Sequence, residues 1–399
     1  MKILFLLSRF PYPLTKGDKL RAYFQMKHLS QEHDIFLFCL NQTSEDYYES
    51  PFPPHKMGDV KDFCKYIQVR NFIRTDAIFG MIRSLFAKKP LQVGYFTHKR
   101  NIRAFKDYVA EVKPDIVFVQ FVRMAEYCRN VPVKCVLDFQ DCLSMNMLRR
   151  SKVCNPALRP LFSREARLLQ KYEAAMFDLF ALTTIITAAD RDSIASERRS
   201  EILISANGID ESYFNYEQTS EKKYDIMFCG NMSYAPNADA AEYLVKSIMP
   251  LIWSRFPDAK VLIAGAEPSF AVRKLASKNV EISGYVRDMR LCYAQSRVFA
   301  APLRIGSGLQ NKLLEAMAIG TPVVCSALAN KALQAAESKE ILIANEPSQY
   351  ANQILRLLNE DSLRQNLVSN ARTFVLNNYN WTSITQNLSS ALQKCVSQR

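Results

Sequence analysis

Residues 301–322, APLRIGSGLQNKLLEAMAIGTP, are the stretch from which the fold is predicted. The stretch predicts a strand end, a tight turn at Gly306 and Gly308, and a helix from about Gln310. The Gly-Thr-Pro break that follows leads into a short apolar strand, Val323–Cys325. A strand, a glycine turn and a helix in this order are typical of a βα unit in a parallel sheet.

The chemistry of this turn favours an anion. Neither glycine has a Cβ, so the backbone can approach a ligand closely, and the free N–H groups of the helix N-terminus face the turn. Lys312 adds a positive charge in the first turn, and Glu315 lies about one helical turn further along the same face. This arrangement suits a nucleoside diphosphate, with Lys312 and the amides at the phosphates and Glu315 at the ribose hydroxyls. An ordinary βα crossover with a solvated lysine and glutamate is the alternative.

The chain is long enough for two domains, and its charge is uneven. It has 399 residues, of which 48% are hydrophobic, as in an ordinary globular protein. Residues 1–200 carry 32 Lys and Arg against 21 Asp and Glu, a net of +11, whereas residues 201–399 carry 20 against 18, a net of +2. The first half therefore faces either an acidic partner, such as a phospholipid or a lipid-linked phosphate, or solvent.

No segment of the sequence predicts export or a membrane span. The apolar run that begins at Met1 ends at Arg9 without a cleavage site, so a buried strand is expected there. No run of about 18 uncharged apolar residues occurs. The ten cysteines and four histidines are scattered, which argues against a zinc site and predicts a reducing, cytoplasmic compartment.

Strands alternate with helices in the first half. Helices are expected at Asp18–Leu29, with Asp18 as N-cap, at residues 101–112 and at Phe162–Leu179. The strands are expected at Ile3–Ser8, Asp34–Leu40, Tyr66–Val69, Ile116–Gln120, Cys135–Asp138, Thr184–Thr187 and Ile202–Ser205, with a loop over residues 42–60. Asp138 and Asp141 then lie at the carboxyl end of a strand, where ligands bind in open α/β sheets.

A further helical pattern covers residues 72–89, where apolar residues recur beside Arg74, Arg83, Lys88 and Lys89. A basic amphipathic helix can lie on an anionic membrane surface, which would place the protein peripherally on the inner face of the membrane. Such a helix can equally pack on a core with its charged face in solvent. The sequence leaves both interpretations open.

The alternation restarts after residues 211–223, a polar stretch that is interpreted as an interdomain linker. We predict an α/β fold with two Rossmann-like, doubly wound parallel-sheet domains, residues 1–210 and 224–375, facing each other across a cleft. A C-terminal helix within residues 376–399 is expected to cross back to the first domain. The strands of the second domain are expected at Asp225–Cys229, Lys260–Ala264, Val280–Ser283, Val298–Pro302, Pro322–Ser326 and Ile341–Ala344. No GxGxxG motif follows the first strand of either domain, which argues against NAD.

Three segments carry a resemblance to a known family: Gly230-Asn231, Gly284 to Asp288, and Pro302 to Pro322. With them, nearly the whole chain resembles the GT-B fold glycosyltransferases of family 4, the glycosyl transferases group 1. The segments Pro11–Arg21, Met124–Tyr127, Asp138–Asp141 and Asn207–Asp210 are similar to the subgroup associated with bacterial exopolysaccharide and exosortase systems.

The resemblance implies a hexosyltransferase that moves a sugar from a UDP- or GDP-linked donor to a hydroxyl of a carbohydrate or lipid-linked acceptor. It further implies retained anomeric configuration and no metal or other cofactor. Gly17 would lie over the donor phosphates, Val286 at the nucleobase and Glu315 at the ribose. Lys312 and Arg304, with the amides near Gly308, would stabilise the leaving diphosphate. The other expected donor-binding residues are Gly230, Asn231, Gly306, Ser307, Gly308, Leu309 and Asn311.

Two departures from the family pattern concern the sugar. The family has a second glutamate eight positions before the one matched by Glu315, where this chain has Ser307. It also often has a histidine after the strand that ends here at Gln120-Phe121. Asp141 is the candidate to replace that histidine, which makes it the fourth expected catalytic residue beside Lys312, Arg304 and Glu315.

Three alternatives remain open at this point. The first is a UDP-sugar 2-epimerase, which shares the fold and needs no acceptor. The second is a non-catalytic subunit that binds a nucleotide sugar without turnover. The third is nucleic-acid binding through the basic half, but no known nucleic-acid-binding module is recognisable, so no such partner is expected.

Overall fold

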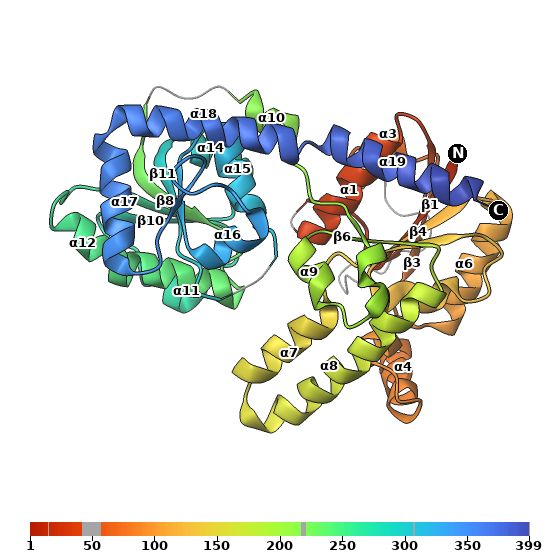
Figure 1. The fold of residues 1–399 in the computed structure, drawn as a ribbon. Helices are drawn as coiled ribbons and strands as arrows, with labels where there is room; N and C mark the ends of the chain where they lie inside the picture. The colour runs from red at the N-terminus through yellow and green to blue at the C-terminus, as the bar shows by residue number, and fades with distance from the viewer. Residues whose placement is uncertain (15, 42–56, 217–220, 306–307, 399) are drawn as a thin grey trace. The chain divides into compact units, whose positions relative to one another are not determined.

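A computed structural model of the chain describes residues 1–14, 16–41, 57–216, 221–305 and 308–398. The chain divides into two compact units (Figure 1). Unit 1 comprises Met1–Ala206 together with Trp381–Arg399, and unit 2 comprises Asn207–Asn380. Over the residues that the structure describes, no helix is both long and apolar enough to cross a membrane.

The centre of unit 1 is a parallel sheet in the order β3-β2-β1-β4-β5-β6-β7. The order reverses between β1 and β4, because the chain extends the sheet to one side of β1 and then to the other. Alternate residues of β1 enter two separate cores, with Leu4 and Leu6 in one and Ile3, Phe5 and Leu7 in the other. A parallel strand buried on both faces has to be apolar throughout. The strands are β1 (Lys2–Leu7), β2 (Asp34–Asn41), β3 (Tyr66–Asn71), β4 (Ile116–Gln120), β5 (Cys135–Asp138), β6 (Leu182–Ile185) and β7 (Leu203–Ile204).

Helices cover both faces of this sheet. On one face, α1 packs beside α19, where the ring of Trp381 stacks on Phe24 at 5.5 Å between centroids. The helices and helical turns of unit 1 are α1 (Gly17–Leu29), α3 (Val60–Phe63), α4 (Arg74–Phe86), α5 (Leu91–Phe96), α6 (Lys99–Val112), η1 (Val122–Cys128), α7 (Leu143–Val153), η2 (Pro156–Leu158), α8 (Arg159–Ala174), η3 (Ala175–Asp178), α9 (Ala188–Ser193), η4 (Glu197–Glu201) and α19 (Trp381–Ser397).

Unit 2 repeats the architecture with the order β10-β9-β8-β11-β12-β13, again parallel. Its strands are β8 (Tyr224–Cys229), β9 (Val261–Ala264), β10 (Val280–Gly284), β11 (Ser296–Ala301), β12 (Val323–Cys325) and β13 (Leu342–Ile343). Its helices are α10 (Glu211–Phe214), α11 (Ala235–Tyr243), η5 (Leu244–Ile248), α12 (Met249–Trp253), α13 (Phe270–Arg273), α14 (Met289–Ala294), α15 (Asn311–Ile319), α16 (Ala327–Leu333), α17 (Pro347–Asn359) and α18 (Asp361–Asn378).

The structure corrects two local predictions and leaves a third largely outside the described residues. Asp18 is not the N-cap of α1: Lys16 holds that position, and Asp18 in the first turn pairs with Arg9 at 3.1 Å. The stretch 211–223 does not begin as a linker, because residues 211–214 form α10 and Asp210 caps it through Ser212 N–H. Most of the predicted loop 42–60 lies outside the described residues, while α3 begins at Val60.

Candidate active site

The topology of unit 2 directs attention to the carboxyl ends of β8 and β11. The strand order reverses between these two neighbours, and in open α/β sheets ligands bind where this occurs. β11 ends at Ala301, and after the glycine turn α15 begins at Asn311. The side chain of its N-cap, Gln310, makes no capping hydrogen bond, so α15 begins without a side-chain cap.

Lys312 lies in the first turn of α15 and is fixed by two contacts. Its Nζ donates to Asn237 Oδ1 at 2.6 Å and lies 4.8 Å from the centroid of the Phe228 ring. Burial lowers the pKa of Lys312, while the nearby Cys229 and Glu315 act in the opposite direction. The ammonium is thus preorganised in a poorly solvated position, where it would act strongly on an anion.

Glu315 lies one turn further along α15. Its Oε2 accepts a hydrogen bond of 2.8 Å from the hydroxyl of Tyr293, which also donates to the Lys312 carbonyl at 3.3 Å. Burial raises the pKa of Glu315, and the bond from Tyr293 and the charge of Lys312 partly offset this. The structure therefore brings Lys312 and Glu315 into one cluster, as an anion-and-ribose site requires.

The other residues expected around the glycine turn differ in what they contact. Gly308 has φ +80°, and a Cβ there would meet no atom within 4 Å among the residues that the structure describes. Asn311 accepts a hydrogen bond of 3.4 Å from Asn207, and Leu309 is half-buried. Gly306 and Ser307 lie outside the described residues.

Arg304 already has a carboxylate partner. Its Nη2 and Nε pair with the two oxygens of Asp239, at 2.5 and 3.1 Å, and the guanidinium lies 4.3 Å from the centroid of the Tyr243 ring. About half of the side chain is exposed. Its charge is therefore largely offset, whereas the hydrogen-bond acceptor of Lys312 among the described residues is the neutral Asn237.

The turns after β8 and β10 complete this edge of unit 2. A Cβ on Gly230 would lie 2.6 Å from Asn237 Nδ2, and one on Gly265 would lie 1.8 Å from the Gly230 carbonyl oxygen. Both positions therefore exclude side chains. The neighbouring Asn231 donates to Glu267 at 3.2 Å. Gly284, the last residue of β10, adopts φ +67°, and Val286 is half-buried in the following turn.

Unit 1 has a second polar cluster at the carboxyl edge of its own sheet, beside its reversal point between β1 and β4. Arg123 lies between two aromatic rings, 4.0 Å from the centroid of Phe121 and 4.8 Å from that of Phe96, and donates to Ser8 Oγ at 3.1 Å. Burial and the charge of Arg9 lower the pKa of Arg123 to about 10. Its Nε has no partner among the described residues.

Asp141 lies near this arginine. Its Oδ2 accepts from Asn146 at 3.0 Å, and its Oδ1 is buried without a partner in the described part of the chain. Burial and then the charge of Asp190 raise the pKa of Asp141 to about 6. Phe121 and Gln140, which follow β4 and β5, both have positive φ values of 70° and 63°. Such strain in non-glycine residues clusters at functional sites.

The other carboxylate of this edge has a structural role. Asp138 is fully buried and accepts two hydrogen bonds from Arg21, at 2.7 and 3.0 Å, and one from Thr184 at 2.8 Å. The hydrogen bonds of Asp138 to Arg21 therefore hold α1 against β5. Gly17 is the first residue of α1, and a Cβ there would meet nothing within 4 Å.

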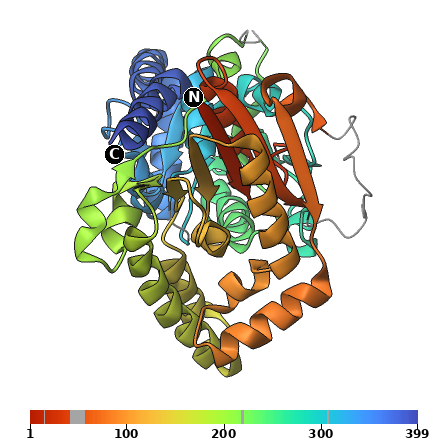
Figure 2. The ribbon, with the colours of Figure 1, turned by 90° about the vertical axis from the view of Figure 1, so that its right-hand side faces the viewer.

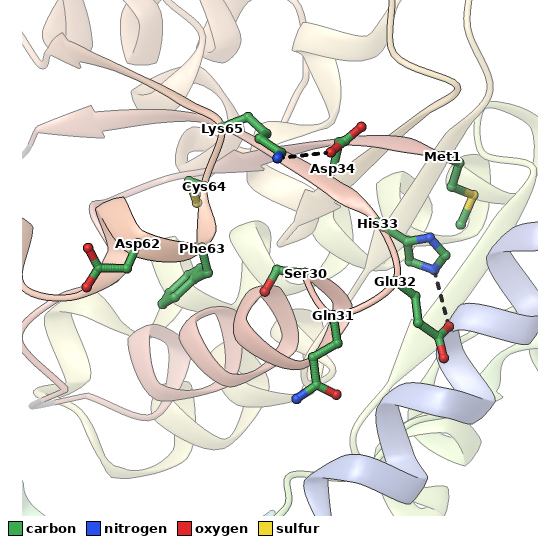
Figure 3. A pocket seen from close by; sticks show the side chains of 10 residues that line it. All are labelled: Met1, Ser30, Gln31, Glu32, His33, Asp34, Asp62, Phe63, Cys64 and Lys65. Carbon is green, nitrogen blue, oxygen red and sulfur yellow. Dashed lines mark ion pairs between the residues drawn. The ribbon is translucent and has the colours of Figure 1, made fainter.

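A polar pocket of about 380 Å³ lies elsewhere on unit 1 (Figure 3). Its walls include Met1 before β1 and Asp34 at the start of β2, so it lies at the amino ends of the strands. Its ion pairs are long, at 3.6 Å for Lys65–Asp34 and 4.0 Å for His33–Glu32. None of its lining residues has a positive φ, and it lies at the edge of the sheet opposite to the one where ligands bind in open α/β folds, so the carboxyl edges remain the candidate sites.

Four functional candidates were not found by sequence reasoning: Asn237, Tyr293, Tyr213 and Arg123. Asn237 and Tyr293 contact Lys312 and Glu315 from α11 and α14, while the Tyr213 ring lies 6.4 Å from that of Tyr293. Burial and the charge of Glu315 raise the pKa of Tyr213 well above its usual value. The one signal for Arg123 was its place three residues after a predicted strand end.

Comparison with known proteins agrees with this geometry. Residues 223–360 match the family described as glycosyl transferases group 1. An uncharacterised 44.6 kDa protein in the cps region of Klebsiella pneumoniae is 22% identical over 95% of this chain and 96% of its own length.

Solved structures of similar fold cover the whole chain. Sucrose-phosphate synthase from Thermosynechococcus elongatus superposes with a TM-score of 0.71 at 14% identity, over 100% of both chains. HepE of Anabaena, in complex with UDP and glucose, gives a TM-score of 0.69 at 15% identity, over 98% of this chain and 99% of that one. With two parallel-sheet units of this topology, the chain has the two-domain α/β GT-B fold of these solved structures, and its residues 223–360 carry a glycosyl transferases group 1 domain.

Proposed function

We propose that the protein transfers a sugar from a nucleoside-diphosphate sugar, UDP- or GDP-linked, to a hydroxyl of a carbohydrate or lipid-linked acceptor during assembly of a bacterial polysaccharide. The observation that carries the proposal is the Lys312–Glu315 pair, one helical turn apart on α15 at the reversal point of the second sheet. The cps-region relative and the UDP complex of HepE support the polysaccharide context and the donor class.

The proposed reaction needs little covalent chemistry from the protein. The bond between the anomeric carbon and the diphosphate oxygen breaks with its electrons going to that oxygen, while the acceptor oxygen bonds to the anomeric carbon and loses its proton. Lys312 and the amides at the start of α15 stabilise the charge that grows on the diphosphate, in the role that a metal ion takes in other transferases. We therefore propose that the reaction needs no metal.

Glu315 would receive the ribose hydroxyls, and Val286 would lie against the base. Arg304 would contribute less than Lys312, because Asp239 offsets its charge. In unit 1, Asp141 and Arg123 offer a carboxylate oxygen and a guanidinium for sugar hydroxyls, which supports Asp141 as the replacement for the absent histidine. Retention of anomeric configuration is proposed on the family likeness.

The test is a thermal-shift screen of the full chain against a panel of nucleotide sugars, followed by an assay of nucleoside-diphosphate release with candidate acceptors and with EDTA. A specific donor should raise the unfolding temperature, since a ligand that binds only the native state stabilises it. Acceptor-dependent release that persists in EDTA supports the proposal. Conversion of the nucleotide sugar without any acceptor would identify a 2-epimerase, and donor binding without turnover would identify a non-catalytic subunit.

A further inference from the structure

Helix α4 of unit 1 exposes its large apolar side chains and buries its small ones. Its buried residues are Ala77, Gly80 and Ser84. Its exposed large apolar residues, which we call the α4 ridge, are Ile78, Phe79, Ile82, Leu85 and Phe86; Phe79 is 67% exposed and Phe86 82%. A helix that only packs on a core has the reverse pattern.

Close packing against α5 explains the small residues on the inner face. A Cβ on Gly80 would lie 2.1 Å from the Gly94 carbonyl oxygen, and a Cβ on Gly94 would lie 2.2 Å from Ser84 Oγ. The two helices therefore approach through glycine and serine, and this contact leaves no space for a large side chain. The packing of α4 on unit 1 therefore does not explain why the residues of the α4 ridge are apolar.

The ridge forms a single stripe with a cation on each side. At about 100° per residue, Leu85, Ile78, Ile82, Phe86 and Phe79 lie within roughly a third of the helix circumference, a sector that also holds the exposed Thr75 of the first turn. Arg74 borders the stripe next to Leu85 and Arg83 borders it next to Phe79, and both are exposed. Lys88 follows the helix and is also exposed, whereas Asp76 is the one acidic residue of α4.

Lys89 does not belong to this border. Its Nζ pairs with Glu126 at 3.0 Å, and Glu126 also accepts from Tyr172 and Arg129. This network lowers the pKa of Glu126 against the effect of burial. The basic face at the ridge is therefore Arg74, Arg83 and Lys88.

Hydrogen bonds from α8 hold the segment around the α4 ridge at an end of unit 1 that projects from its body. Arg164 of α8 donates to the Leu85 carbonyl at 3.5 Å, and the buried Glu165 accepts from the backbone N–H groups of Leu91 and Gln92 at 2.9 Å each. Figures 1 and 2 show α4 and the α7–α8 hairpin extending together from the body of the unit. Leu158 and Leu161, at the start of α8, are exposed at the same end.

We propose that the α4 ridge docks unit 1 on an anionic lipid surface. The apolar stripe enters the boundary between headgroups and acyl chains, and Arg74, Arg83 and Lys88 pair with lipid phosphates beside it. Charge complementarity favours lipid over a protein partner, because cations on both sides of a narrow apolar stripe match a sheet of phosphates over hydrocarbon. The inference deepens the proposed function. The docking itself is independent of that function, and only its purpose, the presentation of a lipid-linked acceptor at that surface, rests on it.

Co-sedimentation of the full chain with vesicles of phosphatidylglycerol, and of phosphatidylcholine as the neutral control, tests the proposal. The double variant Phe79→Gln/Phe86→Gln should reduce the bound fraction about tenfold, because both rings lose their place in the lipid. The triple variant Arg74→Gln/Arg83→Gln/Lys88→Gln should remove the preference for phosphatidylglycerol and the sensitivity to salt. Phe270→Gln is the matched control, since Phe270 is 74% exposed on unit 2 and should leave binding unchanged.

Three outcomes would overturn the inference. They are no binding of the wild type to either vesicle, equal binding by the Phe79/Phe86 variant, and self-association of the wild type that this variant abolishes. The last would show that a second copy of the chain covers the ridge. The thermal shift of the wild type with the donor is measured in parallel. If the wild type binds vesicles but no donor, only the proposed function is contradicted.

Discussion

Lys312 owes its expected effect to what surrounds it. A neutral amide oxygen and an aromatic face hold its ammonium, and burial lowers its pKa. In the part of the chain that the structure describes, no carboxylate forms a direct ion pair with this ammonium, so an approaching diphosphate would gain that interaction. Arg304 illustrates the opposite case, because the carboxylate of Asp239 pairs with its Nε and Nη2. The two cations on either side of the glycine turn are therefore not equivalent.

Lys312→Met keeps the aliphatic stem and removes the charge. We expect kcat to fall by roughly 10²-fold or more, as for the loss of one preorganised donor at a developing anion. Steady-state kinetics with the identified donor provides the measurement. Arg304→Met is the matched comparison and should cost less; a larger loss there, or a Lys312→Met rate within about threefold of wild type, would exclude the assignment of Lys312.

Glu173 supplies a prediction about stability. It is fully buried in α8, accepts from the Ser144 N–H at 3.0 Å and lies 3.8 Å from Cys142 Sγ, and the charge of Asp141 acts on it. Burial raises the pKa of Glu173 to about 7. Because the folded state holds the proton more tightly than the unfolded state, this residue favours folding at pH 4.5 and below, and that contribution is lost as pH rises towards 7.

The contribution of Glu173 to the free energy of unfolding should therefore decrease between pH 4.5 and 7, by up to about 3 kcal/mol at ~1.4 kcal/mol per pKa unit. Denaturant titrations of wild type and Glu173→Gln at several pH values isolate this contribution. Glu173→Gln should remove it from the slope and leave the parts due to the other groups of shifted pKa, such as Asp141, Glu315 and His33, whereas the exposed Glu197→Gln should leave the slope as it is. An unchanged slope in Glu173→Gln would show that the carboxyl is not protonated in the folded protein.

At the scale of elements, buried parallel strands were predictable and long-range polar contacts were not. β4 and β5 have the bounds expected from sequence, since a strand buried on both faces is a short apolar run between polar residues. Helix α7 was missed, because several of its side chains are exposed and its pattern is weak. Asn237 lies 75 residues before Lys312, and Arg21 lies 117 residues before Asp138, so no local pattern could pair them.

Helix α19 shows how a terminal element stabilises a distant one. Trp381 is almost fully buried on Phe24 of α1, and Leu388 and Leu392 continue the contact. Trp381→Ala should lower the stability of unit 1 by about 3–5 kcal/mol through the lost apolar contact and the cavity.

Amide hydrogen exchange provides the measurement: exchange in β1 should accelerate in Trp381→Ala, and Trp381→Phe should restore most of the protection. Trp253 is the one tryptophan left in Trp381→Ala, so its fluorescence reports on unit 2. That signal should show unit 2 unfolding at the same denaturant concentration as in the wild type. Unaltered exchange in β1 would mean that α19 contributes little to the unit on which it packs.

At the scale of the whole molecule, each unit has its own parallel sheet, its own reversal point and its own polar cluster at the carboxyl edge. The clusters differ in chemistry: unit 2 offers an ammonium and a carboxylate one turn apart, whereas unit 1 offers a stacked guanidinium and a carboxyl of raised pKa. We propose on this basis that unit 2 binds the donor and that unit 1 serves the acceptor side. In this proposal α15 of unit 2 binds the nucleotide through Glu315.

Titration calorimetry with the preferred nucleoside diphosphate and its 2′,3′-dideoxy analogue tests that claim most directly. A carboxylate that accepts the ribose hydroxyls contributes ~1.5–3 kcal/mol per bond, so wild type should bind the complete nucleotide about tenfold more tightly or better. Glu315→Gln should bind both compounds with nearly equal, weak affinity and unfold at the wild-type temperature. If the variant retains the preference, or loses stability while its nucleotide affinity holds, Glu315 is a structural partner of Tyr293 and the account is contradicted.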